Sequence, residues 1–216
     1  MSYRGVAVIS FLATALALLL APGPASSVQF DKTEKGKLKQ GKIVKKPLSN
    51  SRQGGFYGGT GWIVVDAPPD VVWTAISDWS SYPKIFPNTV SAEEISRKGD
   101  KSLLKMKLGH KLVSVIYHCE IIKDPKRKIL SFKLVEDLAH DIESARGYWR
   151  LFPQEDGRTL VAYVVAVRIP MGLVNLLGED IESQLEGGLL NVPKHLKKWI
   201  ESPAGSRYRK MVADVK

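Results

Sequence analysis

The sequence contains a single cysteine, Cys119, in 216 residues. One thiol cannot form an internal disulfide, so a folded domain must take its stability from a hydrophobic core. Cys119 lies within an apolar stretch, where we expect a small buried hydrophobic residue rather than a nucleophile. The four histidines lack the spacing of zinc ligands and no CxxC motif occurs, so we predict no metal site and no cofactor. These histidines are His110, His118, His140 and His195.

Long hydrophobic runs are also scarce. The one uncharged apolar stretch, residues 5–20, falls short of the roughly 20 residues that span a bilayer. It follows a basic residue and precedes APGPASS, in which Gly23 and Ala25 supply the small side chains of a cleavage site. We therefore predict a signal peptide over residues 1–25 and an exported, periplasmic protein. An uncleaved N-terminal anchor stays open as the alternative, because prolines flank the cleavage site.

Positive charge is lacking where a nucleic-acid-binding domain would need it. The net charge is +10, yet residues 54–193 carry −2, while residues 31–53 carry +6 and residues 194–216 carry +5. A nucleic-acid-binding domain concentrates its basic face on the folded body, so we predict no nucleic-acid partner. Basic arms either make transient contact with an anionic membrane surface, at about 1 kcal/mol per cation, or simply keep the protein soluble. We assign residues 26–58 to an extended basic linker and residues 203–216 to a basic C-terminal tail.

The main apolar pattern of the chain runs from Leu173 to Ser202. Its large side chains recur at spacings of three and four, which predicts one long helix with a single buried face. They are Leu177, Ile181, Leu185, Leu189, Val192, Leu196 and Trp199. Gly187, Gly188 and Pro193 each weaken a helix interior, so we expect a bend near residues 187–193. The bend is either an ordinary kink or a hinge that opens whatever the helix covers.

The stretches before this helix predict strands separated by turns. Gly61–Ala67 is the first, and Pro68-Pro69 and SSYPKIFPN then indicate two short helices. Six further strands follow, because their apolar runs are separated by turn sequences such as RKGD, DPKRK and QEDG. They are Val90–Ser96, Ser102–Leu108, Lys111–Ile122, Ile129–Glu136, Ile142–Phe152 and Thr159–Ile169. The segment GKIVKKPL in the basic linker is a further piece that could pair at a sheet edge.

This order of elements resembles the START-like superfamily, also called SRPBCC. DAPPDVVWTAISDWSSYPKIFP is similar to its N-terminal signature, and GYWRLFPQEDGRTLVAYVVAV is similar to its last hairpin. The resemblance covers residues 59–202, and the nearest types are coenzyme Q-binding COQ10-type and polyketide cyclase/dehydrase-type members. It implies an α+β helix-grip fold: a seven-stranded antiparallel sheet wrapped around a long C-terminal helix, with two short helices after the first strand. It also implies an apolar cavity between sheet and helix that holds a sterol, quinone, phospholipid or polyketide.

Catalytic residue sets are not evident. His118 and Cys119 are adjacent on a strand, so their side chains point to opposite faces. Glu143 and Arg146 have opposite parity, so one of them at most faces the cavity unless a bulge intervenes. If Glu143 or His118 faced inward, it could act as an acid or base. Enzymatic activity therefore stays open, and we assign no catalytic residue.

The sequence thus predicts that an exported protein binds and transports a hydrophobic ligand, such as a lipid, quinone or sterol-like molecule, in an internal cavity. We expect the cavity that holds the ligand to be lined by eight residues: Phe86, Tyr117, Phe132, Trp149, Tyr163, Leu177, Ile181 and Leu185. This choice assumes that odd-numbered positions of the last strands face inward. A polyketide cyclase/aromatase-like enzyme that uses the same cavity is the first alternative. An adaptor that uses the outer face of the sheet, with a filled interior, is the second.

Overall fold

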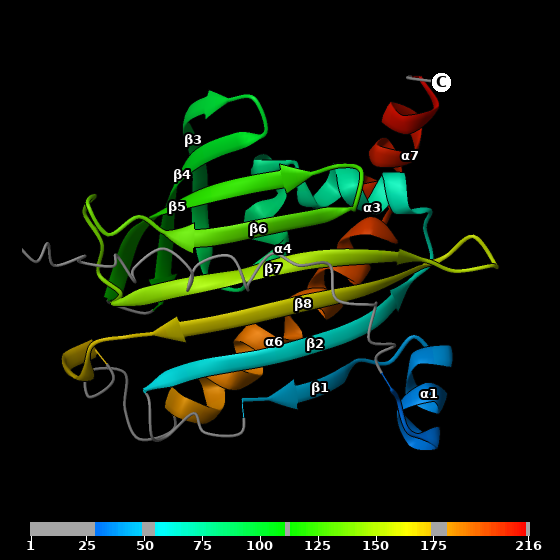
Figure 1. Ribbon diagram of the computed structural model, residues 1–216, viewed down its shortest axis with the longest axis horizontal. Coiled ribbons are helices and arrows are strands. Elements are labelled where there is room, and N and C mark those ends of the chain that lie inside the picture. Colours follow the sequence, from blue (N-terminus) through cyan, green and yellow to red (C-terminus); the bar gives the residue numbers. More distant parts are fainter. Residues whose placement is uncertain (1–28, 49–54, 111–112, 174–180, 215–216) are drawn as a thin grey trace, which may run out of the picture. The chain divides into compact units, whose positions relative to one another are not determined.

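The computed structural model describes residues 29–48, 55–110, 113–173 and 181–214, and residues 32–216 form one compact unit. In the described part of this unit, eight strands form one antiparallel sheet in the order β1-β2-β8-β7-β6-β5-β4-β3 (Figure 1). Their bounds are β1 Val44–Pro47, β2 Phe56–Val65, β3 Thr89–Lys98, β4 Lys101–His110, β5 Val113–Asp124, β6 Ile129–Leu134, β7 Ser144–Pro153 and β8 Thr159–Arg168.

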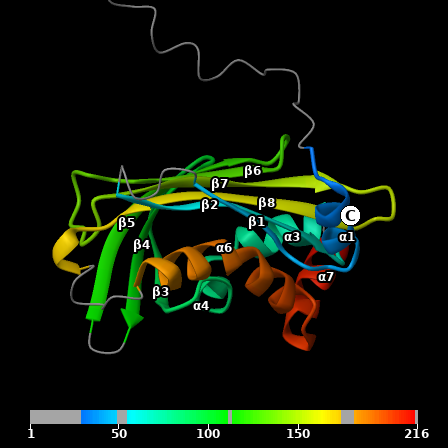
Figure 2. The same cartoon turned by 90° about the horizontal axis from the view of Figure 1, so that it is seen from below.

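The helices lie mainly on one face of this sheet. Figure 2 shows α3, α4, α6 and α7 beneath the sheet, and β4 and β5 curling toward them at one end. The bounds are α1 Lys32–Lys39, α3 Pro69–Ile76, the 3-10 turn η2 Trp79–Ser81, α4 Tyr82–Ile85, α6 Ile181–Ile200, the 3-10 turn η3 Pro203–Gly205 and α7 Ser206–Ala213. The α+β helix-grip arrangement predicted from the sequence is confirmed.

The two faces of the sheet follow from strand alternation. Inward side chains include Leu104 of β4, Cys119 of β5 and Tyr163 of β8, all buried, whereas neighbours such as Lys105 and Glu120 point outward. Inward residues of the sheet join residues of α3 and α6 in one hydrophobic cluster. The six later strands all fall within two residues of their predicted bounds.

The helix α6 lies closest to β2. A Cβ placed on Gly61 would sit 2.9 Å from the Leu190 carbonyl oxygen and 3.1 Å from Cγ of Pro193. A glycine at this position therefore lets the helix backbone approach the strand to a distance that no larger residue allows. The assigned helix is continuous from Ile181 to Ile200 with Pro193 inside it, so Pro193 does not end it.

The sheet has eight strands rather than the predicted seven, because the linker is partly folded. β1 pairs with β2, from Val44 opposite Trp62 to Pro47 opposite Gly59. This is the GKIVKKPL segment, for which the sequence left edge pairing open. Before it, α1 occupies residues that we expected to be extended. α1 has one buried side chain, Leu38, so its apolar periodicity was too weak to signal a helix.

β2 begins at Phe56, five residues before the predicted start. Gly58 and Gly59 precede the predicted strand, and Gly58 was assigned to the extended linker, yet both residues pair in the sheet. Their φ angles are 134° and 141°, and a Cβ on Gly58 would lie 2.1 Å from the Val165 carbonyl oxygen. Glycine is needed here for backbone conformation and close approach rather than for flexibility.

The last residues form a packed helix rather than the predicted tail. Tyr208 of α7 is fully buried, and its hydroxyl donates to Asp78 Oδ2 at 2.9 Å. The same carboxylate accepts from Arg207 at 2.6 Å, and the Trp199 indole donates to the Tyr208 hydroxyl at 3.1 Å. One buried aromatic therefore fixes a helix whose other residues are mostly polar. The proposed signal peptide, by contrast, lies outside the described residues.

Candidate ligand cavity

A cavity of about 250 Å³ lies between the curled part of the sheet and α6. Its walls come from β2 and from β4 to β8, from α4 and the segment after it, and from α6. The strands contribute inward-facing residues such as Met106, Tyr117 and Val165, and α6 contributes Leu185, Gly188 and Leu189. The cavity exists because this part of the helix stands away from the curled strands, and its short side chains do not fill the space.

Aromatic rings form one wall of the cavity. Tyr163 stacks on Phe132 with ring centroids 6.1 Å apart, and Phe86 meets Tyr163 edge to face at 6.2 Å. Tyr82 packs against Phe86 at 4.7 Å. These offset and edge-to-face arrangements are the favoured ones for aromatic pairs and fix the ring positions. The wall is therefore a rigid apolar surface contributed by three separate parts of the chain.

The polar groups of the wall are uncharged. Burial is the main reason that the pKa values of Tyr82, Tyr117 and Tyr163 are raised, and it raises the pKa of the Cys119 thiol to about 12. These groups therefore keep their protons at neutral pH. A neutral thiol is a poor nucleophile, which agrees with the interpretation of Cys119 as a small hydrophobic residue.

Two of the four tyrosines that line the cavity, Tyr57, Tyr82, Tyr117 and Tyr163, have hydroxyls with no hydrogen-bond partner among the described residues. The Tyr82 hydroxyl donates to the Ile76 carbonyl oxygen at 3.2 Å. The hydroxyls of Tyr117 and Tyr163 form no hydrogen bond with any residue that the structure describes. Neither hydroxyl oxygen is completely enclosed by protein atoms. Since both residues line the cavity, their hydroxyls are available to a bound molecule.

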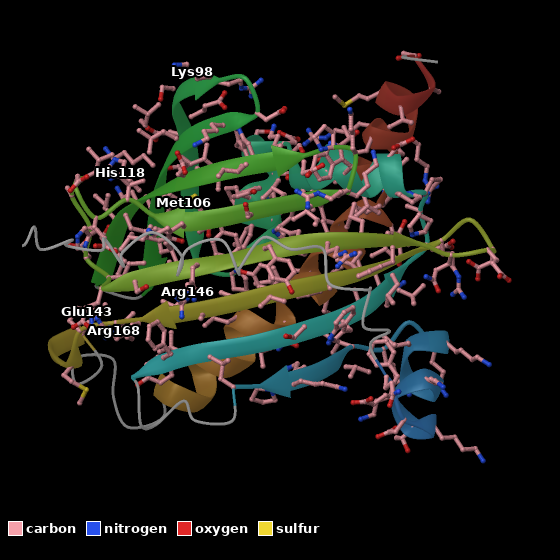
Figure 3. All side chains as sticks on the ribbon, viewed as in Figure 1. Lys98, Met106, His118, Glu143, Arg146 and Arg168 are labelled. Atoms are coloured by element: carbon pink, nitrogen blue, oxygen red, sulfur yellow. The ribbon has the colours of Figure 1, made fainter. Side chains whose placement is uncertain are left out.

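The charged residues considered as acids or bases lie away from the cavity. Glu143 pairs with Arg168 at 2.8 Å, and both side chains are nearly half exposed; Figure 3 shows them side by side. His118 Nδ1 lies 2.9 Å from the Ala139 carbonyl oxygen, and Arg146 lies over the ring of Phe56. Of the described lining residues, none is Asp, Glu, His, Lys or Arg.

The structure brings together five of the eight residues predicted to line the pocket: Phe86, Tyr117, Phe132, Tyr163 and Leu185. Trp149 is not on the wall; it is 1% exposed and packs against Tyr163 with ring centroids 4.3 Å apart. Leu177 and the side chain of Ile181 lie outside what the structure describes. A ligand-binding role for any of these residues remains a prediction.

Sequence reasoning missed the contribution of β4 and of the residues that follow Phe86. Leu104, Met106 and Leu108 line the cavity from β4, and Asn88 and Thr89 line it beside Phe86. The alternation of LLKMKL within β4 could have identified the first three, because Leu104, Met106 and Leu108 share one face. Asn88 has a φ of 62°, and this left-handed turn residue could be placed only with the backbone known.

The described residues contain no group of three or more His, Cys, Asp or Glu side chains arranged to hold a metal ion. No helix in the described part of the chain has both the length and the hydropathy needed to cross a membrane.

A sequence profile described as "Polyketide cyclase / dehydrase and lipid transport" matches residues 65–191, more than half of the chain. The chain belongs to this family. Its fold is the one found in START-superfamily structures, as the resemblance had implied. No curated protein matches the sequence.

Solved structures similar to this family member include enzymes and lipid carriers. An aromatase/cyclase from Streptomyces sp. R1128 has a TM-score of 0.53 at 20% identity, covering 68% of this chain and 96% of that one. A START superfamily protein from Mycobacterium smegmatis has a TM-score of 0.53 at 16% identity, covering 73% and 99%. A STAR-related lipid transfer protein from Xanthomonas axonopodis has a TM-score of 0.51 at 17% identity, covering 74% and 93%. Similarity at these identities establishes the fold alone.

Proposed function

We propose that this protein binds a hydrophobic ligand in the cavity and transports it, the ligand being a lipid, a quinone or a sterol-like molecule. The observation that supports this most directly is the apolar cavity of about 250 Å³ between α6 and the curled strands. Ligand pockets usually measure about 300–1,000 Å³. This cavity is slightly smaller than that range, which suits one acyl chain or a small ring system.

The energetics favour an apolar guest. Each methylene group removed from water contributes about 0.8 kcal/mol, so a chain of ten carbons supplies substantial affinity without any polar contact. The aromatic wall is held by ring–ring contacts before any ligand arrives, which lowers the entropy lost on binding. A rigid, preformed cavity of this kind suits a carrier that must take up and release its ligand unchanged.

A cyclase/aromatase-like enzyme is the alternative, favoured by the similarity of the fold to an aromatase/cyclase. Acid–base catalysis needs a group whose pKa lies near the working pH. The described wall offers tyrosines and one cysteine whose pKa values are raised by burial, and it offers no carboxylate, imidazole or amine. This inventory favours carriage of the ligand over its chemical conversion.

The proposal is tested by extracting the purified protein with organic solvent and identifying the extract by mass spectrometry. We expect a co-purified lipid or quinone, and uptake of the apolar fluorophore N-phenyl-1-naphthylamine by the extracted protein. Transfer of the identified ligand between donor and acceptor vesicles then measures transport. Recovery of no ligand together with no fluorophore uptake would count against a binding function. Conversion of the recovered ligand during incubation would favour the enzyme instead.

We further propose that the protein is exported, because residues 1–25 have the pattern of a signal peptide. Cell fractionation should place it in the periplasm, and its intact mass should show the loss of these residues. A periplasmic protein of full mass would indicate the uncleaved anchor, and recovery from the cytoplasm would contradict export.

We also propose transient contact with anionic membranes through the basic arms. In the structure these arms are α1, the turn after it and α7, and they present exposed Lys35, Lys37, Lys39, Arg209 and Lys210. Each cation near an anionic surface contributes about 1 kcal/mol, an attraction that salt weakens. Sedimentation with phosphatidylglycerol vesicles at low salt should therefore exceed sedimentation with phosphatidylcholine vesicles, and about 0.5 M salt should remove the difference. Equal sedimentation with both lipids would contradict this contact.

A further inference from the structure

We propose that the cavity selects uncharged lipids that carry a hydrogen-bond-accepting oxygen, such as a carbonyl, over anionic lipids such as fatty-acid carboxylates. The inference rests on the proposed function, because it assigns a ligand class to the same cavity. Two observations lead to it: the absence of charge from the described wall, and two tyrosine hydroxyls with no hydrogen-bond partner among the residues that the structure describes.

The first step is the lack of a counter-ion. Of the described residues that line the cavity, none is Lys, Arg or His. Several cations adjacent in sequence to wall residues lie off the wall. Lys105 and Lys107 flank Met106 on β4 and lie on the opposite face, Lys84 of α4 is exposed, and Arg168 pairs with Glu143. A carboxylate moved from water into such a site loses its hydration with no compensating charge, so binding of the charged form is strongly disfavoured.

The second step is the hydrogen-bonding capacity of the wall. Tyr117 of β5 and Tyr163 of β8, two strands separated by β6 and β7 in the sheet, both line the cavity. Each hydroxyl can donate one hydrogen bond, and neither has an acceptor among the described residues. An apolar site with unused donors is complementary to a ligand that is mostly hydrocarbon but carries an acceptor oxygen.

The third step compares these hydroxyls with two other polar groups of the wall, Tyr82 and Cys119. The Tyr82 hydroxyl is already used, since it donates to the Ile76 carbonyl oxygen. The Cys119 thiol is a weak donor. Tyr82 therefore offers a matched control: it lies on the same wall and has the same chemistry, but its hydroxyl is occupied within the fold.

The experiment uses two probes that share one acyl chain. Methyl decanoate is neutral and has a carbonyl oxygen, whereas decanoate carries a charge at pH 7.5. Each competes with N-phenyl-1-naphthylamine, a neutral fluorophore without a carbonyl group, for the cavity of the full chain after extraction. We expect methyl decanoate to bind at least about tenfold more tightly than decanoate, since a buried unpaired charge is strongly disfavoured.

The tyrosines are tested by removing only their hydroxyls. Tyr117→Phe and Tyr163→Phe should each weaken methyl decanoate binding about threefold to tenfold, the range expected for one hydrogen bond, and leave fluorophore binding within about twofold. Tyr82→Phe should lower the thermal midpoint of unfolding without changing the preference for the ester. Circular dichroism of each variant verifies that the fold is retained.

The outcomes distinguish this inference from the proposed function. Decanoate binding as tightly as the ester would overturn the selection against anions. Ester binding that is unchanged in both Tyr117→Phe and Tyr163→Phe would overturn the role of the hydroxyls. In either case fluorophore binding would persist, and the binding function would stand. If neither the fluorophore nor either probe binds, the proposed function itself is wrong.

Discussion

The two ends of α6 differ in how they meet the sheet. At the packed end, defined by Leu190, Leu196 and Ile200, the helix side chains are at most 2% exposed and the backbone approaches Gly61. At the cavity end, defined by Leu185, Gly188 and Leu189, the side chains are half-buried and face the cavity. One helix therefore anchors the fold at one end and encloses open space at the other.

The difference shows how stability and binding are divided along one element. The packed end adds α3 and α7 to the same core, held by the hydrogen bonds of Asp78 with Arg207 and Tyr208. The cavity end places two glycines where larger residues would fit, because a Cβ on Gly187 or Gly188 meets no atom within 4 Å. Substitutions at the two ends should therefore have opposite consequences.

The largest effect is expected from a pair of identical truncations on α6. Leu196→Ala removes a fully buried side chain from the packed end and should lower the free energy of unfolding by about 3 kcal/mol. Leu185 borders a space that is already empty, so Leu185→Ala should lower the free energy of unfolding by about 1 kcal/mol or less. Urea unfolding measures both, and equal losses would break the comparison between the two ends.

A smaller loss is expected from Gly61→Ala on β2. The added methyl would lie 2.9 Å from the Leu190 carbonyl oxygen, so the helix must move outward, at about 2 kcal/mol. Gly36→Ala in α1 is the control, because its Cβ meets no atom within 4 Å. The control should be neutral or stabilising, and a Gly61→Ala protein as stable as the parent would contradict the close approach.

At the cavity end a larger residue should stabilise the helix and block the ligand. Gly188→Leu replaces an interior helical glycine, a gain of about 1 kcal/mol, and fills the cavity. Gly187→Leu has the same gain in helix propensity but does not lie on the cavity wall. Fluorophore titration should show at least tenfold weaker binding for Gly188→Leu alone, and equal binding by both variants would place the ligand elsewhere.

The smallest effect concerns pH. Burial raises the pKa of Cys119 from 9.0 to about 12. Above pH 9 the unfolded chain loses this proton and the folded chain keeps it, so stability falls as the pH rises toward 12. At pH 9.5 the loss is about 0.8 kcal/mol, and Cys119→Ala should lack it. Urea unfolding in reductant at pH 7.5 and 9.5 measures the change in the free energy of unfolding between the two pH values for each protein. An identical change for parent and variant would show that the Cys119 thiol is not shielded from water.

Much of the fold could be predicted because turn sequences and alternation are local. The hairpin breaks RKGD and QEDG fixed the later strands to within two residues. The elements missed are two short, mostly polar helices, α1 and α7, each with a single buried side chain, Leu38 and Tyr208. For the site, odd parity identified Tyr117 and Tyr163 correctly as wall residues, but depth could not be inferred, so Trp149 was placed one layer too close to the cavity.

The edges of the sheet have a consequence for how copies of the chain meet. β1, at one edge, is four residues long, carries two lysines and ends in Pro47, which cannot donate a backbone hydrogen bond. β3, at the other edge, has two register shifts that interrupt its pairing pattern. Neither border offers a flat, uninterrupted row of donors and acceptors to a ninth strand. These features disfavour edge-to-edge pairing of sheets between copies of the chain, which would otherwise lead to aggregation of a protein with an apolar cavity.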